Sequence, residues 1–227
     1  MVDRGVTAEP LPIDVVSDVV CPWCFIGKRR LERAIALADV SVVIRWRPFQ
    51  LDATIPSEGK SRRDYLEQKF GSLERIGKMH EHIAKLGAEL GIPFAFDRIE
   101  VSPNTLDAHR LIRWAAESNA QDPIVEALFR AYFIDGRNIG DAEVLAEIAA
   151  SAGLDRKSVA ERIASDDDRA EVQADVAGAQ RIGVTGVPTF ILADRYGLVG
   201  AQPPEELARA LTQVTAERAG ESQALAS

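Results

Sequence analysis

Residues 12–24 read Pro-Ile-Asp-Val-Val-Ser-Asp-Val-Val-Cys-Pro-Trp-Cys, and this stretch decides the fold. Its first nine residues are rich in β-branched side chains, which predicts a buried strand that runs directly into Cys21. Residues 22–38 then place apolar side chains at helical spacing among charged ones, with a proline in the first turn. A second strand is predicted at residues 42–49. A strand, a helix and a strand in this order predict a right-handed βαβ unit with parallel strands.

The middle of the chain is predicted to be helical, because from about residue 62 to residue 180 nearly every segment carries apolar residues at helical spacing. The β pattern returns at residues 188–193 and 196–201, which predict a hairpin. A last helix begins near Pro203, and the residues from Ala219 onward are expected to fray.

These patterns predict an α/β protein with a discontinuous arrangement. Residues 1–55 and 183–227 are expected to form one sheet domain from both ends of the chain. Residues 56–182 are expected to form a helical insertion within it.

Composition and charge exclude several classes of protein. With 227 residues, 46% apolar and 27% charged, the chain has the composition of an ordinary globular protein, not of a disordered or fibrous one. The net charge of −8 predicts no nucleic-acid partner. No segment approaches the ~20 apolar residues that cross a bilayer, and residues 1–12 carry charges and two prolines, unlike a signal peptide. We therefore expect a cytoplasmic protein without a membrane partner.

The two cysteines, Cys21 and Cys24, are the candidate catalytic residues. A disulfide between residues three apart closes too short a loop to stabilise a fold strongly, so in a reducing compartment the pair indicates redox chemistry or metal binding. Cys21 lies where the predicted helix begins, and the free N–H groups and helix dipole there stabilise a thiolate. We therefore expect Cys21 to be the nucleophile and Cys24, one turn further on, to be the resolving thiol.

Two other interpretations of the pair stay open. Zinc takes four protein ligands, or three and a water, and the remaining candidates His80, His82 and His109 are scattered through the helical region. Alternatively, the cysteines are small core residues that lie three apart by chance. The position between a strand and a helix favours redox chemistry, with no metal and no bound cofactor beyond a Cys21–Cys24 disulfide.

A second motif, Gly183-Val184-Thr185-Gly186-Val187-Pro188-Thr189-Phe190, completes a resemblance to a known family. Together with Cys21-Pro22-Trp23-Cys24 and the helical insertion, it resembles the DsbA family of thioredoxin-fold oxidoreductases over roughly residues 12–215. The most similar branch is the FrnE-like one, which lacks a signal peptide and has Trp in the third motif position. The resemblance implies a thioredoxin fold with a large all-helical insertion. It also implies that Cys21, Cys24 and Pro188 are catalytic, with a cis Val187–Pro188 peptide bond beside the cysteines.

The same resemblance indicates which residues bind substrate. The backbone of Val187 is expected to pair with an extended substrate segment, next to Pro22 and Trp23 of the cysteine motif. In related glutathione-dependent isomerases a segment like Asn104-Thr105 borders the active cleft, which makes Asn104 and His109 candidate substrate-binding residues. For His109 the alternative is a satisfied core histidine.

Asp18, three residues before Cys21, allows two interpretations. Its carboxylate could face the sulfur, where it would raise the thiol pKa or relay protons. Alternatively, it accepts hydrogen bonds from amides of a neighbouring loop, as short acidic side chains often do.

We predict a thiol–disulfide oxidoreductase that acts on protein or small-molecule thiols and disulfides, with glutathione as a candidate co-substrate, as a monomer or homodimer. The alternative is a glutathione-dependent isomerase or transferase of a small aromatic compound, similar to 2-hydroxychromene-2-carboxylate isomerase. Those proteins usually carry Ser at the position that matches Cys21, so the retained cysteine pair argues against that class. A third class, an interaction module without redox activity, requires the cysteines to be dispensable.

Overall fold

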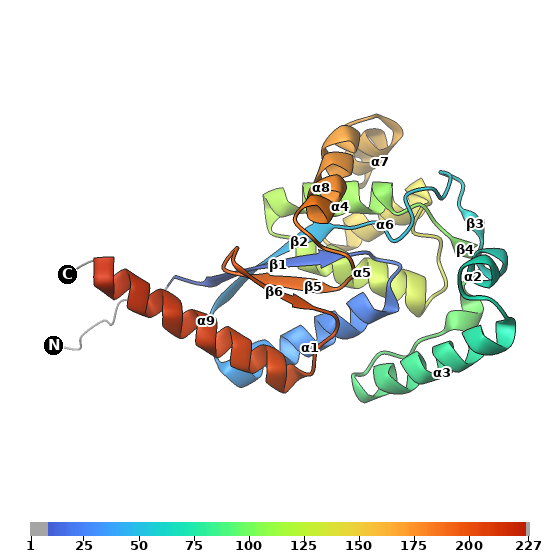
Figure 1. Cartoon of the computed structure of the whole chain (residues 1–227). Helices are drawn as coiled ribbons and strands as arrows, with labels where there is room; N and C mark the ends of the chain where they lie inside the picture. Colours follow the sequence, from blue (N-terminus) through green and yellow to red (C-terminus); the bar gives the residue numbers. More distant parts are fainter. Residues whose placement is uncertain (1–8, 226–227) are drawn as a thin grey trace.

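The computed structural model describes residues 9–225 and contains a four-stranded sheet built from both ends of the chain (Figure 1). The strands are β1 (Leu11–Ser17), β2 (Val42–Pro48), β5 (Thr189–Leu192) and β6 (Tyr196–Val199), in the spatial order β2-β1-β5-β6. β1 is parallel to β2 and antiparallel to β5, and β6 is antiparallel to β5. The predicted βαβ unit and hairpin are therefore confirmed. The expectation that the chain has no signal peptide was drawn from residues 1–12. Of these, residues 1–8 lie outside the described residues.

Helices α1 (Pro22–Ala38) and α9 (Pro204–Leu225) pack against each other on one face of the sheet (Figure 1). The expectation that α9 frays from Ala219 is wrong, because the helix continues to Leu225. Its last turns are held to the β5–β6 hairpin by two side-chain contacts. Tyr196 Oη donates to Glu217 at 2.8 Å, and Arg195 pairs with Glu221 at 2.8 Å.

The first strand ends earlier than the sequence pattern predicts. β1 stops at Ser17, and residues 18–20 form a turn before α1 begins. The turn is closed by the Cys21 N–H, which donates to the carbonyl oxygen of Asp18 at 3.0 Å. The prediction that the strand runs directly into Cys21 is therefore wrong, because the chain must reverse direction between the sheet and the helix that covers it.

The insertion between β2 and β5 is helical, as predicted, except for one short pair of strands. Its helices are α2 (Arg62–Phe70), α3 (Leu73–Glu89), α4 (Leu106–Ala115), α5 (Gln121–Phe133), α6 (Ala142–Ser151), α7 (Arg156–Ala164) and α8 (Arg169–Arg181). Two single-turn 3₁₀ helices, Phe96–Arg98 and Ala116–Ser118, lie between them. The antiparallel strands β3 (Lys60–Ser61) and β4 (Val101–Ser102) join the segments before α2 and before α4. This pairing brings the start of α2 next to the loop before α4.

One hydrophobic core extends from the sheet into the insertion. Phe25 of α1 stacks on Phe129 of α5 with ring centroids 4.9 Å apart. The buried ammonium of Lys28 pairs with Asp122 at 3.1 Å and with Glu126 at 3.3 Å, which ties α1 to α5. The division into a sheet domain and an insertion domain stays a prediction. Within residues 9–225, no helix is both long and apolar enough to cross a membrane.

Candidate active site

Cys21 occupies the N-cap position of α1, as the sequence predicts. Its backbone is extended, with φ −93° and ψ 113°, and Pro22 follows in the first turn. The N–H groups of Cys24 and Phe25 donate to the Cys21 carbonyl oxygen at 3.0 and 3.4 Å. The Cys21 side chain is thus at the positive end of the helix dipole, where a thiolate is stabilised.

Cys24 lies one turn further along α1 in a different environment. The residue is 1% exposed, compared with 5% for Cys21, and both cysteines are free thiols. Burial, and then the neighbouring Cys21 sulfur, raise the pKa of the Cys24 thiol well above its usual range. Cys24 is therefore protonated at neutral pH, and Cys21 is the more accessible sulfur.

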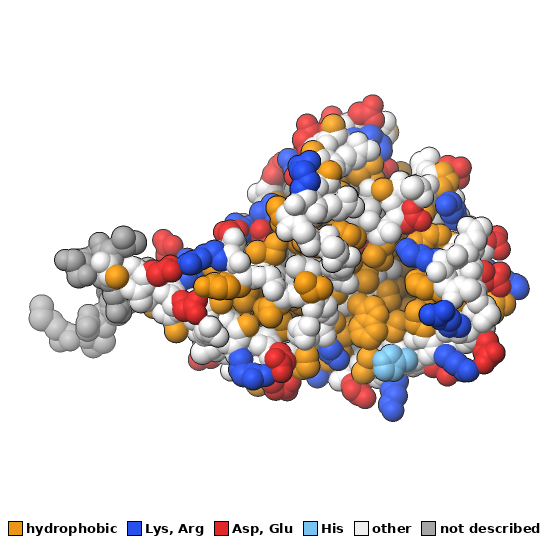
Figure 2. All heavy atoms as spheres, viewed as in Figure 1, with side chains coloured by type: hydrophobic (Ala, Val, Ile, Leu, Met, Phe, Trp, Pro, Cys, Tyr) orange, Lys and Arg blue, Asp and Glu red, His pale blue; other side chains and the backbone are white. Residues whose placement is uncertain are grey.

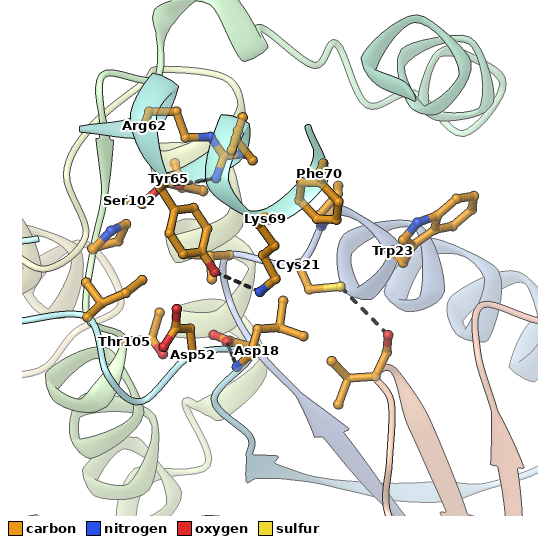
Figure 3. A pocket seen from close by; sticks show the side chains of 18 of the residues that line it. Asp18, Cys21, Trp23, Asp52, Arg62, Tyr65, Lys69, Phe70, Ser102 and Thr105 are labelled. Atoms are coloured by element: carbon orange, nitrogen blue, oxygen red, sulfur yellow. Dashed lines mark hydrogen bonds between the residues drawn. The ribbon is translucent and has the colours of Figure 1, made fainter. Parts of the chain in front are cut away.

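The loop before β5 lies directly beside Cys21. The Val187–Pro188 peptide bond is cis, as the family resemblance implies. The Cys21 thiol donates to the Val187 carbonyl oxygen with an Sγ–O distance of 3.7 Å (Figure 3). Pro188 packs closely on Gly27 of α1, where an added Cβ would lie 2.7 Å from Pro188 Cγ. Gly27, whose importance the sequence did not indicate, thus lets the loop approach the helix that carries both cysteines.

A cavity of about 380 Å³ opens beside Cys21, between the end of the sheet and the helices α2 and α3. Most of its lining is apolar: Val20, Trp23, Leu51, Ile55, Leu66, Phe70, Met79, Ile83 and Val187. Trp23 is 36% exposed, and its ring centroid lies 6.3 Å from that of His82 on α3. Figure 2 shows hydrophobic side chains gathered at the centre of this face of the molecule, with charged side chains along its rim.

Helix α2 contributes polar side chains to the same cavity, and the sequence analysis did not identify them. Arg62, Tyr65 and Lys69 all line the cavity (Figure 3). Lys69 Nζ donates to Tyr65 Oη at 2.8 Å. These residues belong to no motif, and only the β3–β4 pairing and the packing of α2 bring them near Cys21.

Asn104 and His109, the other two residues predicted to bind substrate, do not line this cavity. Pro103 and Thr105 line the cavity, but the Asn104 side chain holds two loops together, because its amide donates to the Ile55 carbonyl oxygen at 2.6 Å. His109 is 3% exposed, and its Nε2 lies 2.9 Å from the Phe49 carbonyl oxygen. The His109 ring borders a separate hollow lined by Trp46 and Ile112.

The Asp18 carboxylate faces the loop after β2. Its Oδ2 accepts a hydrogen bond from the Leu51 N–H at 2.7 Å, which agrees with the loop-amide interpretation. Its Oδ1 lies 3.5 Å from His109 Nε2 and has no hydrogen-bond partner among the described residues. The backbone of Asp18, in contrast, faces the Cys24 sulfur.

The site combines a cysteine pair at the N-terminus of a helix with a cis-proline loop beside it, and the sheet is built from both ends of the chain. These features define a thioredoxin-fold protein with a thiol site. A family model, the DSBA-like thioredoxin domain, matches residues 12–212. The chain belongs to this family, which confirms the resemblance drawn from the two motifs.

Known relatives agree with this assignment. The chain is 31% identical over 186 residues to the uncharacterized protein YwbO of Bacillus subtilis (strain 168), a match that covers 80% of this chain and 86% of the relative. The crystal structure of a probable DsbA oxidoreductase from Streptomyces coelicolor is similar with a TM-score of 0.84 at 34% identity, over 91% of each chain. The cytosolic disulfide reductase DsbM from Pseudomonas aeruginosa, solved with GSH, shares the fold with a TM-score of 0.61 at 22% identity, over 96% of this chain and 100% of that one.

Proposed function

We propose that the chain is a thiol–disulfide oxidoreductase in which Cys21 is the nucleophile and Cys24 the resolving thiol. The observation that carries the proposal is the different environment of the two sulfurs. Cys21 lines the cavity at the N-terminus of α1, whereas Cys24 is buried and the pKa of its thiol is raised. Only Cys21 is placed to meet a substrate.

The reaction follows from this placement. When the protein reduces a disulfide, the Cys21 thiolate attacks one substrate sulfur, the substrate S–S bond breaks, and one substrate thiolate leaves with the electron pair. Cys24 then loses its proton to the solvent and attacks the Cys21 sulfur. This step releases the second substrate thiolate and leaves a Cys21–Cys24 disulfide, so the protein loses the two electrons that the substrate gains.

The substrate contacts are part of the proposal. The carbonyl of Val187 and the exposed ring of Trp23 lie beside Cys21, and Pro188 holds the loop in this position. We include Asn104 and His109 only as residues that shape the cavity from behind. Glutathione is proposed as a co-substrate because the structurally similar DsbM was solved with GSH. A cytoplasmic location and a monomeric or dimeric state also stay proposals.

Trapping of mixed disulfides tests the proposal. The Cys24→Ser variant is incubated with oxidised glutathione or insulin, and the intact mass is measured. We expect one covalent adduct on Cys21, since the attacking thiol remains and the resolving thiol is gone. The matched Cys21→Ser variant should form no adduct. An adduct on Cys21→Ser, or none on Cys24→Ser, would contradict the proposed roles.

The same variants separate the glutathione-dependent alternative. An isomerase or transferase would conjugate glutathione to an aromatic electrophile such as 1-chloro-2,4-dinitrobenzene, and Cys21→Ser would retain that activity. We expect wild type to reduce insulin with glutathione as the reductant and Cys21→Ser to have neither activity. Retained conjugation by Cys21→Ser would favour the alternative.

A further inference from the structure

Arg62, the first residue of α2, brings a guanidinium to the cavity that contains Cys21 (Figure 3). Its Nη1 donates to Tyr132 Oη at 3.2 Å and to Ser102 Oγ at 3.5 Å. Within the described part of the chain, no carboxylate oxygen lies within 4.0 Å of Arg62, and its Nε is buried without a hydrogen-bond partner. The cation therefore lacks a counterion.

His80 of α3 adds a second unsatisfied group to the same cavity. Its ring stacks on Phe96 with centroids 4.2 Å apart, and its Nε2 is buried with no hydrogen-bond partner among residues 9–225. Burial, and then the charge of Arg62, lower the pKa of His80 to about 4. At neutral pH the imidazole is uncharged, so the positive charges at the cavity are those of Arg62 and of Lys69, whose ammonium donates to Tyr65 Oη.

The surroundings of Arg62, which has no carboxylate partner, contrast with those of Arg110, the most deeply buried arginine among the described residues. Arg110 pairs with Asp107 at 2.8 Å and donates to four backbone carbonyls at the C-terminal end of α7 and in the loop between α7 and α8. Arg62 is half-buried, and its partners are two hydroxyl groups and the face of the Tyr132 ring, with its guanidinium carbon 5.7 Å from the ring centroid. A ligand that supplies a carboxylate would add the charge-assisted hydrogen bond that these neutral partners do not give. The carboxylates of Asp18 and Asp52 lie across the cavity from Arg62 (Figure 3).

We propose that Arg62 binds a carboxylate of the substrate, and that the preferred substrate is a small aromatic disulfide or thiol adduct that carries this anionic group. The inference rests on the proposed oxidoreductase function and names the substrate class of that site. A guanidinium donates well-directed hydrogen bonds to carboxylate oxygens. The rings of Trp23, Tyr65 and Phe70 line the cavity and supply the apolar surface, and its volume of about 380 Å³ suits a small ring system.

The probe is 5,5′-dithiobis(2-nitrobenzoic acid), an aromatic disulfide with a carboxylate on each ring, together with its uncharged bis-carboxamide. The Cys21 thiolate attacks one sulfur of the probe, the S–S bond breaks, and one coloured aryl thiolate leaves. Cys24 releases the second aryl thiolate by attacking the mixed disulfide, and its proton passes to the solvent. Stopped-flow absorbance of the reduced protein, at near-physiological ionic strength, gives the second-order rate constant for each probe.

We expect Arg62→Gln to lower the rate constant for the carboxylate probe about tenfold and to change that for the carboxamide less than twofold, because a charge-assisted hydrogen bond is lost in one case only. Arg62→Lys should recover part of the rate. Arg63→Gln is the matched control, because it removes the same charge one residue along, where the side chain is 69% exposed. It should leave both rate constants within twofold of wild type.

A second measurement needs no variant. With wild type, 2-naphthoate should slow the reaction of Cys21 with the carboxamide probe, and 2-naphthamide at the same concentration should slow it much less. The inference is overturned if Arg62→Gln slows both probes equally or neither, if Arg63→Gln has the same effect as Arg62→Gln, or if the two naphthalene compounds compete equally. Failure of wild-type Cys21 to react with either probe would instead overturn the proposed function.

Discussion

The sulfur of Cys21 lies 3.7 Å from the carbonyl oxygen of Val187, a residue 166 positions further along the chain. Cys21 is the N-cap residue of the helix after β1, and Val187 lies in the loop two residues before β5, which pairs with β1 in the sheet. The pairing of the first and fifth strands therefore brings the two motifs of the sequence together at one end of the sheet. This arrangement has consequences for reactivity, stability and pH dependence that experiments can measure.

Cys21 should react with alkylating agents much faster than Cys24. Cys21 lies at the helix N-terminus and lines the cavity, whereas burial raises the pKa of the Cys24 thiol. At pH 7 we expect brief treatment of the reduced protein with iodoacetamide to modify Cys21 at least about tenfold faster, as peptide mass mapping would show. In the Cys21→Ser control, Cys24 should stay largely unmodified. Equal labelling of both cysteines would exclude the assigned roles.

Replacing Gly27 with alanine should destabilise the protein. The new Cβ would lie 2.7 Å from Pro188 Cγ, so the loop beside Cys21 must move. We expect the free energy of unfolding to fall by about 1–2 kcal/mol, because overpacking outweighs the better helix propensity of alanine. The reaction of Cys21 with disulfides should also slow.

Gly77 provides a control for the Gly27→Ala variant, because it is also a glycine within a helix. Gly77 lies inside α3, and apart from its chain neighbours and the adjacent backbone of its own helix, no described atom lies within 4 Å of the position of its Cβ. Gly77→Ala should therefore raise the free energy of unfolding by about 0.5–1 kcal/mol. Denaturant titrations of both variants measure the two changes, and a stabilising Gly27→Ala would show that the packing of Pro188 on α1 is not close.

Asp18 should act by holding a loop and not by relaying protons. Its Oδ2 accepts from the Leu51 N–H, so Asp18→Asn keeps an acceptor for this bond and removes only the charge. We expect this variant to change both thiol-exchange steps less than about twofold. Asp18→Leu leaves the Leu51 N–H without a partner and should lower the free energy of unfolding by about 1–3 kcal/mol. A selective slowing of the Cys24 step in Asp18→Asn would support the proton-relay interpretation instead.

Stability should fall between pH 6.5 and pH 4 in part because of His80. Burial and the charge of Arg62 lower the pKa of His80 to about 4, below the value near 6.5 of the unfolded chain. In this pH range the unfolded state binds more protons than the folded state, so the free energy of unfolding decreases as the pH falls. The contribution of this partly exposed ring is about 1 kcal/mol after solvent screening is allowed for.

The comparison with a variant isolates this contribution. In His80→Asn the decrease between pH 6.5 and pH 4 should be shallower, while the carboxylates contribute equally to both proteins. The imidazole resonances of His80 in wild type should titrate near pH 4, and Arg62→Gln should raise that midpoint. A His80 midpoint near 6.5 in wild type would contradict the partly buried position of His80 beside Arg62.

Local sequence patterns predicted most of the secondary structure, because the formation of a helix or strand depends largely on residues that are close together in the sequence. The β-branched run before Cys21 predicted β1, and the helical spacing after Pro22 predicted α1, whose bounds agree with the structure. Apart from the short strands β3 and β4, which the pattern missed, the errors fall at element ends. β1 stops at Ser17 because a turn must follow it, and α9 continues past Ala219 because Tyr196 and Arg195 hold its end.

By itself, the sequence determined the fold class and singled out the cysteine pair as the candidate redox site, since the pair lies where a strand pattern gives way to a helix pattern and Val187-Pro188 follows much later. Only the tertiary structure decided what surrounds Cys21. Arg62, Lys69 and His80 lie on helices without any motif, and they reach the cavity because β3 pairs with β4 and α2 packs on α3. His109 is the opposite case. The Asn104-Thr105 segment suggested that its ring borders the cleft, but the ring borders a separate hollow lined by Trp46 and Ile112, which the sequence did not indicate. Helical periodicity specifies which face of a helix is buried, but the neighbours of that face depend on long-range packing that no local pattern records.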